Sequence, residues 1–467
     1  RQMCIRDRIY TNITNREERN KMKKFTVCLL IGAMAASMLT GCGSNGGSSD
    51  SSDSKADSSS ETMTIMMNGS DSDAYMEGYR KIIDGFNESN EYGVKVEIQN
   101  VTNSDYKTKL TTMMASDSET DIIFTWELGY LENFVNGDKI VSLQKYLDED
   151  EEWKNSFNGG ILDPLTYDGE VYAIPTQQST AIMYYNKAIF DKYGLEVPTT
   201  YDEYVQVCDT LKENGVTPVA LASTADDAWL VSQYIQQLSD GIKGEDLFNS
   251  IKGGTGKWND EGMVEAGKLF QEEVNKGYFE DGFTGVSREE AQLQFANGQT
   301  AMYFNGCWEI SNLDKKENAA EAENISCFLM PAVNEEYAGV EVGSVDTSYA
   351  ITKNCKNVDA AVALLKYMTN EESTSSLLYD YGRFPSTNID IDDSKLTPLC
   401  ADFVNLLGDA KAQTPWFDRV DTDLGNEFNN TAIGIANGDD VQEAFDTLQS
   451  YACLLYTSPS PRDRSVS

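Results

Sequence analysis

The chain has 467 residues, 40% of them hydrophobic and 10% aromatic, which suffices for two or three core-sized units and excludes a disordered protein. Its 37 Lys and Arg against 76 Asp and Glu give a net charge of −39, which argues against a nucleic-acid partner because phosphates would be repelled. Histidine is absent, which removes the Ser-His and Cys-His pairs of hydrolases and most zinc sites, so we expect no catalytic residue, metal or cofactor. Surface carboxylates in this number favour a soluble monomer, and they also suit a cationic ligand.

The amino-terminal residues carry the features of an export signal. Residues 1–21 show neither periodicity nor a targeting pattern, and we interpret them as a non-native extension derived from a sequencing adapter. From Met22 a charged start leads into an apolar stretch, Phe25 to Leu39, that is too short for a stable membrane anchor. Residues 22–41 are therefore predicted to be a signal peptide.

This signal ends in the run Leu39-Thr40-Gly41-Cys42, which resembles the lipobox of bacterial lipoproteins. The small residue before the cysteine admits the lipoprotein signal peptidase, and the thiol of Cys42 would then carry the lipid anchor. Residues 42–61 are almost wholly Gly, Ser, Asp, Asn and Lys, and they are predicted to form a flexible tether. The mature protein is thus expected on the cell membrane, lipid-anchored on the extracytoplasmic face.

Strands and helices alternate from residue 62 onward, as in an α/β fold. We predict helices and strands in the order Thr62–Met67 (strand), Tyr75–Phe86 (helix), Val94–Ile98 (strand), Tyr106–Met114 (helix) and Asp121–Glu127 (buried parallel strand). Binding sites in such folds lie beyond the carboxyl ends of the strands. Four polar or aromatic residues fall at such positions: Ser70, Asp71, Trp126 and Glu127.

The middle of the chain predicts two strands with a polar break between them. Val171–Ile174 and Ala181–Tyr185 are rich in β-branched and aromatic residues, and Pro175–Thr180 between them is polar. An amphipathic helix follows and stops at Gly194, and a capping box at Thr200 predicts the start of the next helix.

Several of these runs resemble bacterial ABC-transporter extracellular solute-binding proteins, in particular the sugar-binding (maltose-binding-protein-like) family. The matching runs are Tyr184-Tyr185-Asn186-Lys187, Gln292–Gly306 with Trp308 after it, the return strand Gly343–Lys353 and Tyr381-Gly382-Arg383-Phe384-Pro385. The resemblance covers nearly all of residues 62–452 in the expected order. It implies an α/β, two-lobe periplasmic-binding-protein fold (type II-like), with a ligand cleft between lobes that are joined by hinge segments.

The same resemblance implies where a ligand binds. It places the first crossing between the lobes near Gln178 and the return near Asp346, and it implies that the ring of Trp308 stacks on a ligand pyranose. Trp229, in a predicted helix, either belongs to the core or faces the cleft. Sugars present apolar ring faces and many hydroxyls, so aromatic and polar side chains suit them. The candidate ligand-binding residues are Ser70, Asp71, Trp126, Glu127, Gln177, Gln178, Trp229, Trp308, Asp346, Arg383 and Trp416.

These crossings predict a discontinuous domain organisation. Lobe 1 is expected to comprise residues 62–178 and 347–389, and lobe 2 residues 179–346 and 390–452. Residues 453–467 are interpreted as an adapter-derived tail.

The predicted function is the capture subunit of an ABC importer, which binds a sugar or oligosaccharide and delivers it to membrane permease subunits by lobe closure. It is not expected to be an enzyme. Two alternatives stay open. One is a surface glycoside hydrolase, although no carboxylate pair stands out in the sequence. The other is a binding protein for a cationic solute such as a polyamine, which the acidity suggests.

Overall fold

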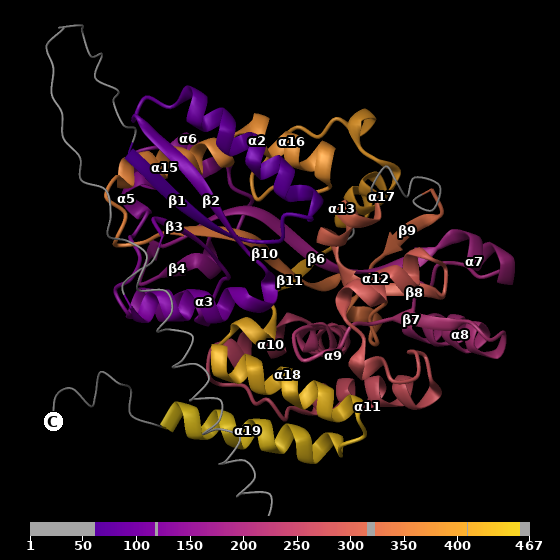
Figure 1. Cartoon of the computed structure of the whole chain (residues 1–467). Helices are drawn as coiled ribbons and strands as arrows, with labels where there is room; N and C mark the ends of the chain where they lie inside the picture. The colour runs from indigo at the N-terminus through magenta and orange to yellow at the C-terminus, as the bar shows by residue number, and fades with distance from the viewer. Residues whose placement is uncertain (1–60, 117–119, 315–322, 409, 458–467) are drawn as a thin grey trace, which may run out of the picture. The chain divides into compact units, whose positions relative to one another are not determined.

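The computed structural model describes residues 61–116, 120–314, 323–408 and 410–457 (Figure 1). The predicted extension (1–21), the signal peptide (22–41), the tether up to residue 60 and the tail from residue 458 lie outside these ranges. Within them, no helix combines the length and the hydropathy that a bilayer crossing requires.

The described residues form two hydrophobic cores, each built from strands and helices, which confirms the predicted two-lobe α/β fold. The first core includes Ile65, Tyr106 and Leu365. Its elements are β1 (Glu61–Asn68), α2 (Ala74–Ser89), β2 (Val94–Val101), α3 (Asn103–Ala115), β3 (Ile122–Thr125), α4 (Gly129–Asn136), α5 (Gln144–Asp148), α6 (Glu151–Ser156), η1 (Asp163–Leu165), the hairpin β4 (Thr166–Tyr167) and β5 (Glu170–Val171), α15 (Val358–Met368) and α16 (Glu371–Tyr381).

The second core includes Tyr234 and Phe428, and we call the part of the chain around it the second lobe. Its elements are α7 (Lys187–Tyr193), α8 (Tyr201–Glu213), β7 (Thr217–Ala220), α9 (Ala228–Lys243), α10 (Glu245–Lys252), α11 (Glu261–Lys276), η2 (Phe283–Gly285), α12 (Arg288–Ala296), β8 (Thr300–Gly306), η3 (Cys307–Glu309), α13 (Ile310–Leu313), β9 (Ile325–Phe328), η5 (Glu335–Tyr337), η6 (Asp393–Lys395), α17 (Pro398–Leu407), β11 (Ala412–Thr414), η7 (Phe417–Arg419), α18 (Thr422–Ala436) and α19 (Val441–Thr457).

Two long antiparallel strands, β6 (Ile174–Asn186) and β10 (Val340–Ile351), connect the cores (Figure 1). They lie in the middle of a sheet with the strand order β2-β1-β3-β10-β6-β8-β7, while β9 pairs with β6 and β11 with β10. The β1–β2 and β1–β3 pairs are parallel, as predicted for β3. Ile174 and Tyr349 belong to the first core, whereas Tyr184 and Val342 belong to the second, so each long strand serves both lobes.

The predicted break at Pro175–Thr180 is wrong, because these residues form part of the continuous strand β6. A proline lacks the amide N–H that a central strand normally donates, so it is tolerated mainly at edges and bulges. Here the partner strand adapts: the pairing of β10 with β6 shifts register on both sides of Thr347, opposite Pro175 and Gln177. The bulge leaves Asp346 outside the regular ladder, where its side chain is free to turn toward other partners.

The predicted helix signals around β6 act as expected. Gly194 adopts φ 65° at the end of α7, a left-handed conformation that favours glycine. The Thr200 side chain accepts a hydrogen bond from the Glu203 amide, which caps the start of α8. These local signals fix the direction in which the chain enters the second lobe.

Candidate functional site

The two long strands and the loop after α16 bring three predicted site residues together where the lobes meet. Arg383 donates from Nε and Nη2 to Oε1 of Gln177, at 3.0 and 2.8 Å, and its Nη2 also pairs with the Asp346 carboxylate. All three side chains are buried or nearly so, and the guanidinium lies 4.6 Å from the ring centroid of Tyr75. The positive charge of Arg383 is therefore compensated within the protein.

A second buried ion pair links the end of β3 to η7 in the second lobe. Glu127 is fully buried, and its Oε2 accepts hydrogen bonds from Ser344 Oγ at 2.7 Å and from the Val345 amide at 3.3 Å. Arg419 Nη1 lies 3.2 Å from Glu127 Oε1 and also donates to the Val345 carbonyl at 2.7 Å. Burial raises the pKa of Glu127, and the Arg419 guanidinium opposes that rise. The pair joins segments from both lobes.

The chain is strained directly after Glu127. Leu128 adopts φ 56° and ψ −140°, a region that residues with a side chain rarely occupy and that costs roughly 1–3 kcal/mol. Its amide donates to the Pro164 carbonyl at 3.0 Å, and Tyr167 Oη donates to its carbonyl, so both polar groups are held. This conformation turns the chain into α4 immediately behind the buried carboxylate.

Three tryptophans from separate segments form one cluster beside this ion pair, which we call the tryptophan cluster. Trp229 begins α9, Trp308 lies in η3 just after β8, and Trp416 precedes η7. Their ring centroids lie 5.8 Å (Trp229–Trp308), 6.4 Å (Trp229–Trp416) and 5.5 Å (Trp308–Trp416) apart. The Arg419 guanidinium lies 3.4 Å from the Trp416 centroid, which connects the cluster to the ion pair. Trp229 and Trp308 are partly buried against the second core, and Trp416 is 6% exposed.

The tryptophan cluster also explains a glycine of the predicted run. A side chain on Gly306 would meet the Trp308 ring at 2.0 Å from its Cβ, so only glycine lets the indole lie over the end of β8. This contact fixes where the Trp308 ring can sit.

The remaining predicted residues lie in different settings. Trp126 packs edge-on against Phe124 and Tyr130, with centroids 4.7 and 5.0 Å away, and Lys107 Nζ lies 5.1 Å from its ring centroid. Asp71 is largely exposed and pairs with Arg80 on the first-lobe surface.

Ser70 and Gln178 make mainly local or backbone contacts. The Ser70 hydroxyl lies 2.9 Å from the hydroxyl of Ser72, and the backbone N–H of Gln178 donates to the Phe384 carbonyl at 3.0 Å. All eleven candidate residues stay predictions as ligand contacts.

Several residues of this region were not among the predicted candidates, chiefly Arg419, Lys107, Tyr130 and Asp418. The one sequence signal for Arg419 is a basic residue three positions after Trp416 in a strongly acidic chain.

Buried polar atoms without a hydrogen-bond partner gather around the same residues. Unpaired buried polar atoms are uncommon, because each costs free energy unless a ligand or water satisfies it. Among the described residues near the lobe junction they include Gln177 Nε2, Trp229 Nε1, Trp416 Nε1, Tyr130 Oη and Asp418 Oδ1. Three of these five atoms are N–H donors, so a ligand that carries acceptor oxygens could supply their missing hydrogen-bond partners.

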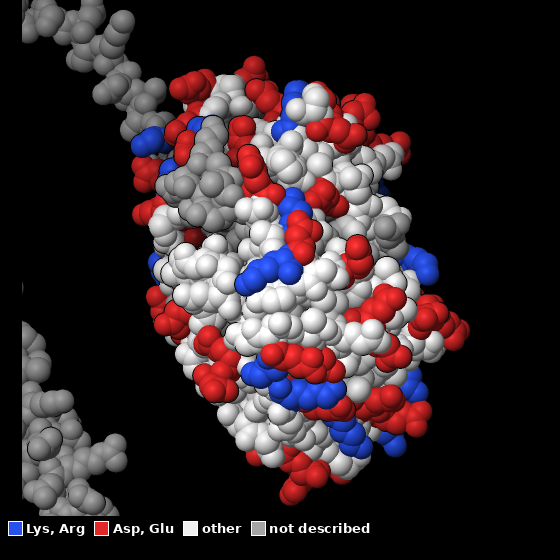
Figure 2. Space-filling view, turned by 90° about the vertical axis from the view of Figure 1, so that its right-hand side faces the viewer, with Lys and Arg blue, Asp and Glu red and all other residues white. Residues whose placement is uncertain are grey.

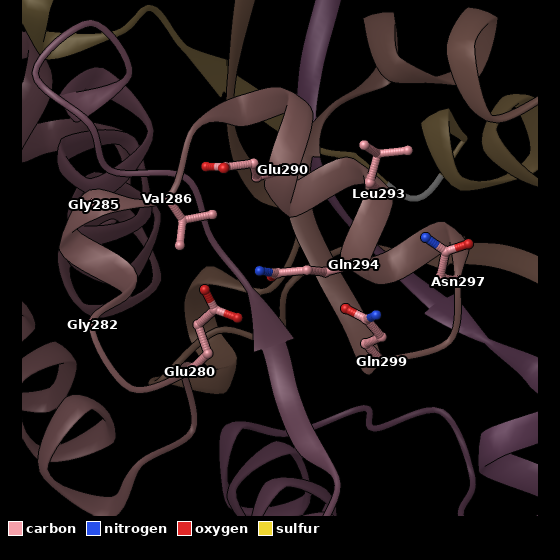
Figure 3. A pocket seen from close by; sticks show the side chains of 9 residues that line it. All are labelled: Glu280, Gly282, Gly285, Val286, Glu290, Leu293, Gln294, Asn297 and Gln299. Carbon is pink, nitrogen blue, oxygen red and sulfur yellow. The ribbon is translucent and has the colours of Figure 1, made fainter.

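A separate hollow of about 430 Å³ lies on the second lobe between η2 and α12 (Figure 3). None of the predicted site residues lines it, and the Glu290 side chain is already used to cap α12 through the Ser287 amide. Its lining consists of Glu280, Gly282, Gly285, Val286, Glu290, Leu293, Gln294, Asn297 and Gln299. Across the described ranges, no group of three or more His, Cys, Asp or Glu side chains is arranged to hold a metal ion.

Comparison with known proteins identifies the family of this chain. The family of bacterial extracellular solute-binding proteins matches residues 69–375. An uncharacterised ABC transporter extracellular-binding protein of Pyrococcus horikoshii is 25% identical over 308 residues, which cover 63% of this chain and 69% of that protein. The multiple sugar-binding protein of Streptococcus mutans is 28% identical over 240 residues, 49% of this chain and 54% of that protein.

Solved structures show the same fold. A structure from work on xylan utilization by the thermophilic bacterium Caldanaerobius polysaccharolyticus is 27% identical, with a TM-score of 0.76 over 84% of this chain and 99% of that chain. A chitin oligosaccharide binding protein superimposes with a TM-score of 0.77 at 21% identity, over 84% and 98% of the two chains. The chain belongs to the bacterial extracellular solute-binding protein family of ABC transporters, which confirms the family predicted from its sequence.

Proposed function

We propose that this protein captures a sugar or oligosaccharide between its lobes and delivers it to the permease of an ABC importer. The observation that carries the proposal is the tryptophan cluster at the lobe junction, with unpartnered N–H donors beside it. A sugar ring offers an apolar face for an indole and oxygens for buried donors. The related proteins of Streptococcus mutans and the chitin-oligosaccharide-binding structure are named for sugar ligands, which agrees with this chemistry.

The charge pattern of the site fits a neutral solute. Arg383 is paired with Asp346, and Arg419 with Glu127, so neither the guanidinium groups nor these carboxylates are left to bind a charged ligand. On the face shown in Figure 2, acidic side chains are scattered with Lys and Arg among them instead of forming one patch. The acidity is therefore better explained by solubility than by attraction of a polyamine.

A glycoside hydrolase is supported less well. Such an enzyme needs one carboxylic acid to protonate the leaving group and a second carboxylate to act as nucleophile or base. Two of the carboxylates at the lobe junction, Glu127 and Asp346, are each held by an arginine, and the buried Glu309 beside Trp308 accepts a hydrogen bond from Asn312. A group that must release and accept protons or attack a sugar carbon is poorly placed in such a pair.

We further propose that the mature protein is a monomer held on the extracytoplasmic face of the membrane through Cys42. The support is the run Leu39-Thr40-Gly41-Cys42 and the tether of residues 42–61 behind it. In a bacterial host, Cys42→Ala should move the protein from the membrane fraction to the soluble fraction. A variant that stays with the membranes would contradict the anchor.

A thermal-shift screen tests the proposed ligand class. Xylotriose, maltotriose, raffinose, triacetylchitotriose and their monosaccharides are compared with spermidine on the purified folded part. A ligand present at 100 times its dissociation constant adds about 2.7 kcal/mol to the free energy of unfolding, which raises the melting temperature measurably. Stabilisation by spermidine and by none of the sugars would favour a polyamine receptor, and hydrolysis of any oligosaccharide by the purified protein would favour the enzyme.

A further inference from the structure

The rings of the tryptophan cluster are not stacked in parallel. Their planes meet at 49° (Trp229–Trp308), 46° (Trp229–Trp416) and 90° (Trp308–Trp416). A flat sugar ring that lies on one of these indoles therefore cannot lie flat on the other two. The three residues must play different parts.

Trp416 offers little open ring surface. The guanidinium of Arg419 lies 3.4 Å from the ring centroid and covers one face, and the residue is only 6% exposed. Arg419 is itself held by hydrogen bonds to Glu127 and to the Val345 carbonyl, so its guanidinium is fixed in position over the Trp416 ring. Stacking of a ligand on that face of Trp416 would require the buried ion pair of Arg419 and Glu127 to be broken.

The Trp416 indole nevertheless carries an unused polar atom. Its Nε1 is buried without a hydrogen-bond partner, and the same holds for Nε1 of Trp229 and for Nε2 of Gln177. Trp153, far from the cluster in the first core, shows the usual arrangement, because its Nε1 donates to Thr369 Oγ1 at 2.9 Å. The orphan atoms of these three residues are all donors.

We propose that Trp416 and Trp229 determine specificity as hydrogen-bond donors, reading acceptor oxygens of the solute through Nε1, while Trp308 supplies the stacking face. The inference deepens the proposed function and rests on it. Trp308 suits the stacking part because it is half-buried and its ring is seated on Gly306. A solute that carries only N–H donors cannot accept hydrogen bonds from Trp416, Trp229 or Gln177. The hydroxyl, ring and glycosidic oxygens of a sugar can accept them.

The chain offers a direct readout because it has six tryptophans, so indole-labelled protein gives six indole N–H signals. Proton–nitrogen spectra are recorded on the intact folded part while xylotriose, maltotriose, raffinose or triacetylchitotriose is added. We expect the Trp416 and Trp229 indole protons to move downfield and to become protected from exchange with solvent. The Trp153 signal, which already has its acceptor, should stay in place and serves as the internal control.

Two matched variants separate donation from stacking. Trp416→Phe keeps an aromatic ring and removes the N–H, so affinity should fall roughly tenfold or more. Trp308→Phe makes the same chemical change at the stacking position, and its affinity should fall less than about threefold. Trp153→Phe, in the first core and away from the cluster, controls for loss of a buried indole, and the melting temperature of each variant is measured without ligand.

The outcomes are distinguishable. If a sugar binds but the Trp416 and Trp229 signals stay fixed, or if Trp308→Phe is the more damaging change, the donor assignment is overturned and the sugar-binding function stands. If none of the sugars shifts either the spectrum or the melting temperature, the proposed function fails and the inference fails with it.

Discussion

The buried carboxyl of Asp240 should make the stability of this protein depend on pH. Asp240 lies on α9 and is fully buried; its Oδ2 accepts a hydrogen bond from Thr414, and its Oδ1 has no partner. Burial raises its pKa to about 8. The neighbouring carboxyl of Glu341 is also buried, and burial together with Asp240 raises its pKa well above the usual range. Glu245 is the further acidic group that acts on Asp240.

The sign follows from where the proton resides. The unfolded chain releases the Asp240 proton near pH 4, whereas the folded chain retains it up to about pH 8, so folding becomes less favourable as pH rises between these values. The loss amounts to about 1.4 kcal/mol per pH unit for one group. Asp240→Asn is neutral at every pH and keeps an oxygen for Thr414. Its stability relative to wild type should therefore increase by on the order of 4 kcal/mol between pH 5 and pH 8.

Urea unfolding followed by tryptophan fluorescence at pH 5, 6, 7 and 8 measures this difference. Asp84→Asn, on the exposed side of α2, is the matched control and should show no such trend. Burial also raises the pKa of Glu341, so Glu341→Gln should likewise gain stability relative to wild type as the pH rises. A difference between Asp240→Asn and wild type that stays constant from pH 5 to pH 8 would refute the reasoning.

Three further outcomes are expected. Trp308→Ala should weaken sugar binding by roughly 1–3 kcal/mol in titration calorimetry. Because the ring is half-buried, the substitution should lower the free energy of unfolding by less than the roughly 3–5 kcal/mol lost with a core aromatic residue. Wild-type affinity with a collapsed melting temperature would remove Trp308 from the site. Arg419→Met should destabilise the folded chain by about 3–5 kcal/mol in urea, since Glu127 would be left buried and unpaired, and adding Glu127→Gln should recover part of the loss; a double variant as unstable as the single one would contradict this. Small-angle scattering should give a smaller radius of gyration with saturating ligand, and an unchanged value would count against lobe closure.

Local patterns in the sequence predicted much of the fold. The strands β1 and β3, the helix α2, the glycine stop at Gly194 and the cap at Thr200 all depend on residues close in sequence, so periodicity and capping rules suffice for them. The continuity of β6 was missed because a proline is a local breaker, whereas the bulge that accommodates it belongs to a strand that pairs from far along the chain.

The candidate site was only partly predictable for a similar reason. The family resemblance pointed to Trp308 and Arg383, but nothing local distinguishes Arg419 from a surface arginine. Its partner Glu127 is 292 positions away, and both side chains are buried in the folded chain. Which polar atoms remain without partners is likewise a property of packing and has no sequence signal.

The two long strands have a consequence for how this molecule unfolds. β6 and β10 contribute residues to both cores, so neither core can melt without pulling apart strand pairs that the other core needs. A chain with two cores would ordinarily be expected to lose them one after the other. Here the shared strands couple the cores energetically, so heat should unfold them in one cooperative step, and neither lobe is expected to fold when it is expressed without the other.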